Sequence, residues 1–511
     1  MSGASRGRSL VLLRLSGEVS TKADATRRRF VDRLQTNAHD ALVSEGIGHR
    51  IRVTRNRLLA EVDGAEAIPV LARLFGVQSV SAVEPRPAES VEQVVQAGVE
   101  LFADRVAGHR FAVRARRVGD RHEAPLRPAE IEKQLGAALR PRSAGVDLED
   151  PEVTVRVELF GGRAHFFTEA VPGPGGLPLG TEGRAVALCS GGFDSAVAAW
   201  RMLRRGVAED FVFCNLGGVS HRLGALRVMV ELARRWCYGT RPRLHAIEFG
   251  PVGEEICRAT ERRFWQVHLK RMMLRAAETV ARESGALAIV TGESVGQVSS
   301  QTLRNLAVIR QATELPVLQP LAGSNKDEIL AEARAIGTFD LSAAVGEYCG
   351  LVPRRPATTS RLDAILRQEE RIDPAVLRTA LEAREVLDLR SLEPEAIGIP
   401  ELEVQEIPPE ATVLDLRDLR AYRSWHWPGA LHLEFGQALR AWPSFDRSQR
   451  YVLYCEFGLK SAHLAELMRE AGFRVHHYAR GIHSLRELAA RASTRAGGEP
   501  VGSRSGAEPP G

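Results

Sequence analysis

The sequence predicts a multidomain protein of mixed α+β and α/β class, and three observations support this. The chain has 511 residues, too many for one hydrophobic core, so we expect three or four domains. The N-terminal third alternates short apolar strands with helical stretches, which is typical of small α+β units. The rest alternates buried-type strands with helices, which is typical of parallel α/β sheets.

The composition is that of a globular protein, with 44% hydrophobic and 26% charged residues. No apolar run approaches the length of a membrane-spanning helix, and the first apolar stretch fits a β-strand better than a signal peptide. We therefore expect a cytoplasmic location and no membrane partner. The six cysteines lack CxxC spacing, which argues against a zinc site or a secreted disulfide framework. The net charge of +5 is compatible with a nucleic-acid partner without requiring one.

Two α+β domains are expected before a Pro- and Gly-rich connector at residues 171–180. The first covers residues 1–65 and the second residues 66–170. Their expected strands and principal helix are strands 10–15, 50–53, 58–62, 111–119 and 153–159, and helix 25–42.

Beyond the connector we expect a parallel-sheet domain over residues 178–385, a linker at 386–403, a smaller α/β domain at 404–490 and a disordered tail at 491–511. The first strands of the larger domain are AVALC, DFVFCNL, LHAIEF and ALAIVTG, with helical segments between them. The smaller domain takes its strands from TVLDLR and YVLYC.

A loop at residues 190–195, SGGFDS, follows the AVALC strand and opens a helix. Its two glycines let backbone N–H groups approach a phosphate, and the helix N-terminus adds partial positive charge. Asp194 is well placed to hold Mg²⁺ on a pyrophosphate group. The GxxxxGK[ST] pattern is absent, so cleavage of a γ-phosphate is not expected. A glycine-containing turn without a ligand is the alternative.

The loop resembles the PP-loop of ATP pyrophosphatases, and further segments resemble the tRNA 4-thiouridine synthetase (ThiI) family. These segments are residues 213–218, 269–273, 291–302 and 347–350. The likeness covers nearly the whole chain. It implies a ferredoxin-like domain, a THUMP RNA-binding domain, a PP-loop (adenine nucleotide alpha hydrolase-like) domain and a rhodanese-like domain, in that order.

The resemblance also implies ATP and Mg²⁺ as cofactors, with Asp194 as metal ligand and catalytic residue. Lys270 and Arg271 also fit solvated helix charges. Asn325 stands where the family usually has an acid, although Lys326 beside it can still meet phosphate charge. The implied nucleotide-binding residues are Leu188, Cys189, Ser190, Gly191, Gly192, Asp194, Ser195, Asn215, Leu216, Gly217, Gly218, Lys270, Gly292, Gln301 and Lys326.

Two cysteines are candidate catalytic residues. Cys455 lies between a strand and a helix, where backbone amides and the helix dipole favour a thiolate that can hold a sulfane sulfur. VLDLR and HWPGA upstream resemble rhodanese patterns, but Phe457 replaces a common arginine and leaves Lys460 as the nearby cation. Cys349 lies in GEYCG, and the family match implies a catalytic role. Packing at Cys455 and an incidental thiol at Cys349 are the alternatives, and the other four cysteines are expected to pack.

An RNA-binding surface is indicated by Arg114, Arg116 and Arg117, which resemble the THUMP signature, and by residues 15–22, which resemble the family's opening motif. Alternate arginines on a strand place charge on one face, where phosphates can lie. A solvated basic surface explains the same pattern. With the family likeness, tRNA is the expected partner, recognised mainly by shape and backbone.

The resemblance implies a reaction. ATP adenylates uridine 8 of tRNA, and a Cys455 persulfide, loaded by a cysteine desulfurase, delivers sulfur. Cys349 then forms a disulfide with Cys455, which a cellular thiol reductant reopens. Sulfur delivery to the thiazole-forming machinery of thiamine synthesis is an implied second role. The rivals are an amidotransferase-type PP-loop ligase, against which the rhodanese-like segment argues, and a tRNA-binding scaffold, against which the intact SGGFDS loop argues.

Overall fold

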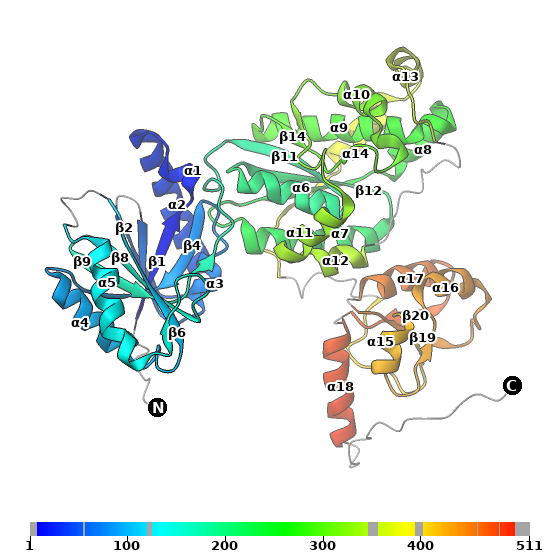
Figure 1. The fold of residues 1–511 in the computed structure, drawn as a ribbon. Helices are drawn as coiled ribbons and strands as arrows, with labels where there is room; N and C mark the ends of the chain where they lie inside the picture. The colour runs from blue at the N-terminus through cyan, green and yellow to red at the C-terminus, as the bar shows by residue number, and fades with distance from the viewer. Residues whose placement is uncertain are drawn as a thin grey trace. The chain divides into compact units, whose positions relative to one another are not determined.

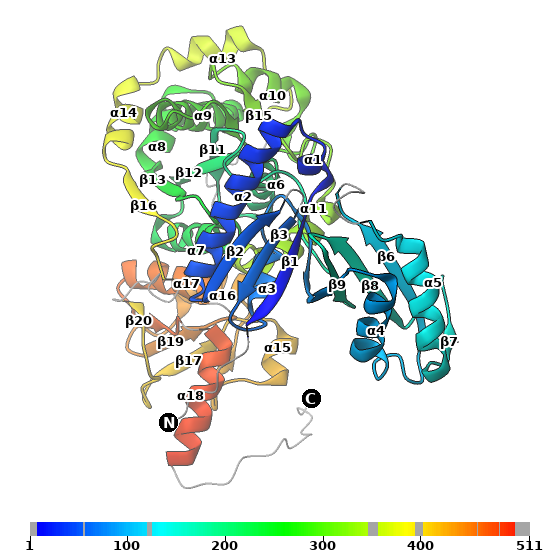
Figure 2. The same cartoon turned by 90° about the vertical axis from the view of Figure 1, so that its left-hand side faces the viewer.

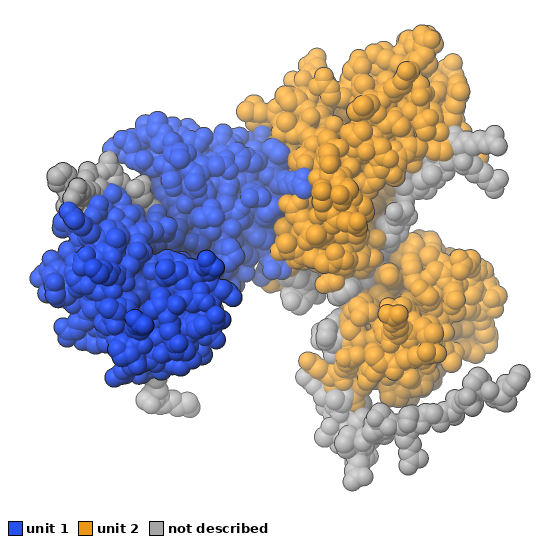
Figure 3. Space-filling view, in the orientation of Figure 1, with its two compact units in different colours: residues 1–184, 200–209, 234–241 blue, residues 185–199, 210–233, 242–511 orange. Residues whose placement is uncertain are grey.

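The computed structural model describes residues 8–54, 57–119, 125–345, 356–393, 402–456, 458–479 and 481–495. The chain divides into two compact units, coloured separately in Figure 3. Unit 1 holds residues 1–184, 200–209 and 234–241, and unit 2 holds the remainder. Among the described helices, none is long and apolar enough to cross a membrane.

The first sheet of unit 1 has the strand order β10-β4-β1-β3-β2. Figure 2 shows β1, β3 and β2 side by side. β1 pairs antiparallel with both β3 and β4. Phe30 and Leu34 of α2 are buried in the core beneath this sheet. The elements are β1 (Ser9–Leu15), α1 (Gly17–Ser20), α2 (Asp24–Ser44), β2 (His49–Thr54), β3 (Arg57–Val62), α3 (Ala67–Leu71), β4 (Val77–Ala82) and β10 (Val171–Pro172).

The expected strands and helix of this part are present, but the boundary expected at residue 65 falls inside the sheet. β4 pairs with β1 and β10 pairs with β4, so both β4 and the start of the connector belong to the first sheet. The period-two burial of β3 indicated one apolar face, but local pattern does not show which later strands pair with it.

The second sheet of unit 1 has the order β5-β9-β8-β6-β7. Figures 1 and 2 show α4 and α5 against one face of it. Val94, Ile131 and Leu135 of these helices share a core with Val155 and Val157 of β8. The elements are β5 (Glu84–Pro87), α4 (Val91–Phe102), β6 (Arg110–Arg117), α5 (Pro128–Leu139), β7 (Gly145–Val146), β8 (Val153–Phe160) and β9 (Arg163–Phe167).

The larger sheet of unit 2 has the order β15-β14-β11-β12-β13-β16. The chain therefore leaves β11 towards β12 and β13 on one side and returns to β14 and β15 on the other. Ligands of open α/β sheets bind beyond the carboxyl ends of the strands at such a reversal. The strands are β11 (Arg184–Cys189), β12 (Ala208–Asn215), β13 (Arg243–Glu248), β14 (Ile289–Val290), β15 (Val317–Leu318) and β16 (Glu385–Asp388).

Helices flank this sheet, as the parallel pairing of β11 with β14 and of β12 with β13 requires. The last strand, β16, pairs antiparallel with β13 and includes the first residues of the segment expected to be a linker, so that segment starts with sheet structure. The helices are α6 (Phe193–Arg204), α7 (Gly218–Trp236), α8 (Gly250–Ala259), α9 (Trp265–Ser284), α10 (Leu303–Arg310), α11 (Lys326–Ile336), α12 (Phe339–Ala344), α13 (Leu362–Glu369) and α14 (Pro374–Glu382).

The C-terminal domain of unit 2 contains a parallel sheet of order β18-β17-β19-β20. β19 lies between β17 and β20, so its carboxyl end is flanked by the ends of both neighbours. The elements are β17 (Thr412–Asp415), α15 (Leu419–Ser424), β18 (Leu431–His432), α16 (Phe435–Ala441), β19 (Arg450–Tyr454), α17 (Leu459–Glu470), β20 (Arg474–His477) and α18 (Gly481–Arg495).

Candidate functional site

The loop at residues 190–195, here the Ser190 loop, joins β11 to α6 at the reversal of the larger sheet. The Ser195 hydroxyl accepts from the backbone N–H of Ser190 at 3.3 Å and donates to the carbonyl of Gly192 at 3.0 Å. Gly191 has φ +76°, and a Cβ there would lie 2.7 Å from the Cα of Ala225. The loop is therefore a tight turn at a helix N-terminus, a geometry suited to an anionic group.

Asp194 is the charged centre of the Ser190 loop. Its carboxylate accepts from Lys326 Nζ at 2.8 Å and from Gln297 Nε2 at 2.9 Å. The Asp194 side chain is 24% exposed, so a ligand can reach it. Asn325 caps α11, its side chain accepting from the N–H of Glu328 at 2.9 Å. The amide that stands for the family's acid thus fixes the start of the helix that carries Lys326.

The segment after β14 supplies the facing wall. A Cβ on Gly292 would lie 2.8 Å from the backbone carbonyl carbon of Asp194. Lys270 on α9 donates to Glu293 at 3.1 Å. Burial raises the pKa of Glu293, but Lys270 and neighbouring donors outweigh this, so the pKa is below its ordinary value. Gln301 is buried, and its Oε1 has no partner among the described residues, which leaves it able to accept from a ligand.

A second turn, after β12, precedes α7. The Asn215 side chain accepts from the N–H of Gly217 at 3.2 Å and donates to the carbonyl of Gly218 at 3.0 Å. Leu216 follows directly and is half-buried. Leu188 is half-buried in β11, and Cys189 ends that strand as a buried thiol whose pKa burial raises strongly.

The donor set around Asp194 bears on metal binding. The described residues hold no cluster of three or more His, Cys, Asp or Glu able to ligate a metal. Mg²⁺ is usually held by one or two carboxylates together with substrate phosphates. A single carboxylate on a phosphate-type loop therefore fits Mg²⁺ that arrives with a nucleotide, and not a resident protein-only metal site.

The loop from Cys455 to Ser461, here the Cys455 loop, joins β19 to α17 at the carboxyl edge of the smaller sheet. Cys455 is 2% exposed and is a free thiol. Its Sγ lies 3.5 Å from the Ser461 Oγ. Lys460, the expected cation of this loop, has its Nζ 6.0 Å from the centre of the Phe435 ring. Phe457 lies outside the described residues.

Buried polar contacts hold the strand that leads into Cys455. Asp415 pairs with Arg417, whose Nη2 lies 2.6 Å from the carboxylate, and both side chains are buried. The Tyr454 hydroxyl donates to the same carboxylate at 2.7 Å and accepts from the N–H of Trp427 at 3.1 Å. The VLDLR and HWPGA segments therefore meet at the residue preceding Cys455.

A basic cavity of about 390 Å³ lies in unit 1. Glu158, 1% exposed, forms ion pairs with Arg14, Arg57 and Arg116. Burial raises the pKa of Glu158, but the three guanidiniums outweigh it and the net shift is downward. Because the single negative charge of Glu158 cannot balance three guanidinium groups, the cavity keeps a positive electrostatic potential. The arginines lining the cavity are Arg14, Arg57, Arg114, Arg116 and Arg156.

The structure separates the three arginines of the expected RNA surface. Arg114 and Arg116 line this cavity, whereas Arg117 does not and instead donates to the carbonyl of Leu126 at 2.8 Å. The two-residue period of a strand sends adjacent side chains to opposite faces. Arg271 is also not a solvated charge, because it is 1% exposed and donates to Glu369.

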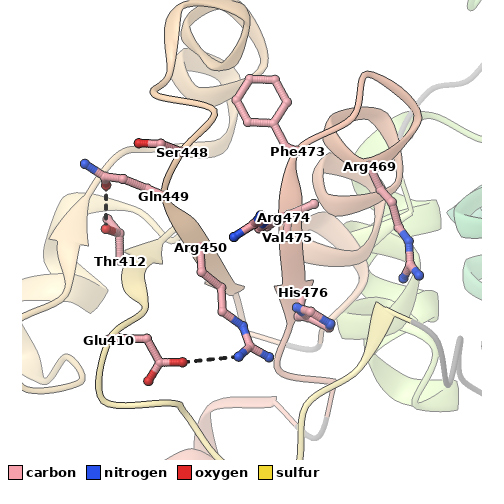
Figure 4. Close-up of a pocket in the computed structure, with 10 residues that line it drawn as sticks. All are labelled: Glu410, Thr412, Ser448, Gln449, Arg450, Arg469, Phe473, Arg474, Val475 and His476. Atoms are coloured by element: carbon pink, nitrogen blue, oxygen red, sulfur yellow. Dashed lines mark hydrogen bonds and ion pairs between the residues drawn. The ribbon is translucent and has the colours of Figure 1, made fainter.

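A further pocket, of about 680 Å³, opens at the amino edge of the smaller sheet. Figure 4 shows Arg450 reaching towards Glu410, with His476 beside it. Because β19 begins at Arg450 and ends at Tyr454, this pocket lies at the end of the sheet opposite Cys455.

Comparison with known families matches four parts of the chain. The matches are to the ThiI ferredoxin-like domain over residues 10–81, the THUMP domain over 88–169, the thiamine biosynthesis protein ThiI over 180–373 and the rhodanese-like domain over 402–487. The tRNA sulfurtransferase of Pyrobaculum aerophilum is 37% identical over 91% of this chain and 96% of its own length. The chain belongs to the tRNA sulfurtransferase family.

Other members support the assignment. The tRNA sulfurtransferase of Thermoplasma acidophilum is 33% identical over 92% of this chain and 94% of its own, and that of Aeromonas hydrophila is 32% identical over 90% and 98%. Among solved structures, a 4-thiouridine synthetase–RNA complex with bound ATP matches 74% of this chain and 99% of its own, at 28% identity and TM-score 0.64. The expected fold class, with ferredoxin-like, THUMP, PP-loop and rhodanese-like domains, is confirmed.

Several contacts of this tRNA sulfurtransferase family member were not anticipated from its sequence. Gln297 donates a hydrogen bond to Asp194, and Lys270 donates one to Glu293. His477 lies within hydrogen-bond distance of Ser461 in the Cys455 loop. Gln297 and Glu293 lie within the TGESVGQ segment that signalled the family, so that segment was the available signal. Cys349 lies outside the described residues.

Proposed function

We propose that this protein makes 4-thiouridine at position 8 of tRNA, using ATP and a sulfur atom carried on Cys455. The observation that carries the proposal is the presence, on one chain, of an anion-binding loop around Asp194 and a thiol-bearing loop at Cys455. Each loop joins a strand end to a helix N-terminus in a parallel sheet. The family's 4-thiouridine synthetase with bound RNA and ATP supports the substrate assignment.

In the first half-reaction the uridine O4 attacks the α-phosphate of ATP, and pyrophosphate leaves. Backbone N–H groups of the Ser190 loop donate hydrogen bonds to the phosphate oxygens, and Lys326 offsets the negative charge of these oxygens. Asp194 would hold Mg²⁺, which supplies charge neutralisation at the leaving group. Adenylation converts a poor oxygen leaving group into AMP.

In the second half-reaction a cysteine desulfurase loads the Cys455 thiolate with a sulfane sulfur. The outer sulfur attacks C4 of the adenylated base and AMP leaves. The Cys349 thiolate then attacks the Cys455 sulfur, which releases the 4-thiouridine and leaves a Cys349–Cys455 disulfide. A cellular thiol reductant reopens it. We extend the same persulfide to the thiazole-forming machinery as a second acceptor, and place both reactions in the cytoplasm.

The test is reconstitution with unmodified tRNA, ATP, Mg²⁺, cysteine and a desulfurase, with pyrophosphate and 4-thiouridine measured together. Cys455→Ser should release pyrophosphate without making 4-thiouridine, and Cys257→Ser serves as the matched control thiol. No pyrophosphate release by the unaltered protein contradicts the proposal and favours a scaffold. Pyrophosphate release without tRNA thiolation also contradicts it and favours a ligase. Full multiple turnover by Cys349→Ser would replace the disulfide route with release of hydrosulfide from Cys455.

A further inference from the structure

Behind Cys455 the structure contains a row of three buried side chains. The Cys455 Sγ lies 3.5 Å from the Ser461 Oγ, and this oxygen lies 3.4 Å from the His477 Nδ1. Cys455, Ser461 and His477 are 2%, 0% and 1% exposed. Cys455 directly follows β19, Ser461 lies in the first turn of α17 and His477 ends β20. Leu453 and His477 are partners in the β19–β20 register, which brings the histidine to the thiol.

The Ser461 hydroxyl has only one proton for its possible acceptors. With a neutral thiol, Ser461 donates to the carbonyl of Gly458 at 3.1 Å. That carbonyl also accepts the backbone N–H of Ala462 at 3.1 Å, so it stays hydrogen-bonded when the hydroxyl turns away. Turning the Ser461 proton towards sulfur therefore costs little.

His477 is the donor that completes the row. Burial, together with smaller effects of Arg227 and His476, lowers its pKa to about 3, so the ring is neutral at neutral pH. Its Nε2 has no partner among the described residues. Placing the ring proton on Nδ1 avoids burying an unpaired N–H and aims this donor at Ser461.

We propose that His477 and Ser461 form a neutral donor relay, Nδ1–H to Oγ–H to sulfur, that positions and stabilises the anionic sulfur of Cys455. Both are positioning residues, because only Ser461 reaches the sulfur and His477 acts through it. The inference rests on the proposed function of Cys455 as sulfur carrier. In that reaction the Cys455 thiolate bonds to the outer sulfur of the donor persulfide, whose S–S bond breaks as the donor leaves as a thiolate.

The relay differs from an ion pair in its chemistry. A protonated histidine would pair with the thiolate but would become an unpaired buried cation when the Cys455 sulfur becomes the neutral inner sulfur of the persulfide. A neutral relay can hydrogen-bond to the sulfur in both states and exchanges no proton. Arg227 interacts electrostatically with both Cys455 and His477, and His476 interacts with His477. Glu403 interacts in turn with Arg227. All three groups are unchanged in the variants below.

The test is the pH dependence of Cys455 alkylation by iodoacetamide in the full chain, read from the mass of the peptide that contains Cys455. His477→Leu and Ser461→Ala should each move the midpoint about one pH unit upward and slow alkylation about tenfold at pH 7. His477→Asn keeps a donor near the Nδ1 position and Ser461→Thr keeps the hydroxyl, so both should retain the wild-type midpoint. The rate plateau at high pH, which reports access to sulfur, should stay constant.

Midpoints of the Leu and Ala variants that coincide with wild type overturn the relay. A changed plateau with an unchanged midpoint also overturns it, since the residues then only pack. The measurement contains no tRNA, ATP or sulfur donor, so it is independent of sulfur transfer. Failure of unaltered Cys455 to take sulfur from a desulfurase would remove the carrier role while leaving the alkylation profile as a separate result.

Discussion

The Ser190 loop and the Cys455 loop have the same local architecture and different surroundings. Each follows a parallel strand, contains a left-handed glycine and opens a helix: Gly191 has φ +76° and Gly458 has φ +79°. The Ser190 loop presents the partly exposed Asp194 to charged partners. The Cys455 loop buries its thiol beside the Ser461 hydroxyl and the neutral His477 ring, and Arg227 is the cation that interacts with it. The backbone turn therefore supplies the amides, and the side chains around it decide which chemistry is possible.

The largest effect is expected when the charge of the Ser190 loop is removed and the Cys455 loop is left unchanged. Asp194→Asn should lower AMP release about a thousandfold, because losing a metal ligand costs several kcal/mol at the leaving group. Persulfide uptake by Cys455 and tRNA affinity should stay unchanged. The exposed Asp104→Asn is the control, and AMP release near the wild-type rate in Asp194→Asn would show that this loop does not bind the nucleotide.

Exchanging glycine for alanine tests the shared turn. A Cβ on Gly191 would lie 2.7 Å from the Ala225 Cα, and one on Gly458 would lie 2.4 Å from the Ala479 carbonyl oxygen. In each variant, the clash and the left-handed strain together should displace the loop at a cost of about 3 kcal/mol. This corresponds to about a hundredfold loss in the rate of the half-reaction at that loop.

Gly191→Ala should therefore lose pyrophosphate release but keep persulfide uptake, and Gly458→Ala should keep pyrophosphate release but lose persulfide uptake. Gly323→Ala and Gly436→Ala are matched controls, because nothing lies within 4 Å of a Cβ at either position. Loss of both half-reactions in one variant would mean that the loops are not independent.

Substitutions outside both loops should change tRNA binding and leave the chemistry of both loops intact. Arg114→Gln or Arg156→Gln, in the basic cavity of unit 1, should weaken tRNA binding about tenfold and reduce the salt slope by about one. The turnover number at saturating tRNA should not change. Arg163→Gln, exposed on the neighbouring strand and absent from the cavity lining, is the control, and an equal loss there would mean a diffuse surface.

The smallest expected effect is on stability. The pKa of His477 is about 3 in the folded protein against an ordinary 6.5, so below pH 6.5 the unfolded chain binds a proton that the folded chain does not. The free energy of unfolding of the C-terminal domain should then decrease as the pH is lowered. This residue should contribute a decrease of about 1 kcal/mol between pH 6 and pH 5. Limited proteolysis in urea, read on residues 402–495, should show a flatter pH dependence for His477→Leu. Parallel curves would contradict a buried neutral histidine.

The sequence specified local features better than the contacts between them. The Ser190 loop was recognisable because its glycines, serines and acid are contiguous. The bond from Lys326 to Asp194 joins residues 132 positions apart and depends on β14 lying beside β11. His477 reaches the Cys455 loop only because β20 pairs with β19. Arg271 was left open between a solvated and a functional charge, and its buried partner Glu369 lies 98 positions away.

The pairing of β16 with β13 fixes where the tether of the C-terminal domain begins. From Asp388, the end of β16, to Leu402 the chain advances fourteen residues, which span about 50 Å at full extension. A tether of that length confines Cys455 to a small volume around the larger sheet, with an effective concentration on the order of millimolar. In the proposed reaction, sulfur delivery is then a first-order event, and diluting the enzyme does not slow it.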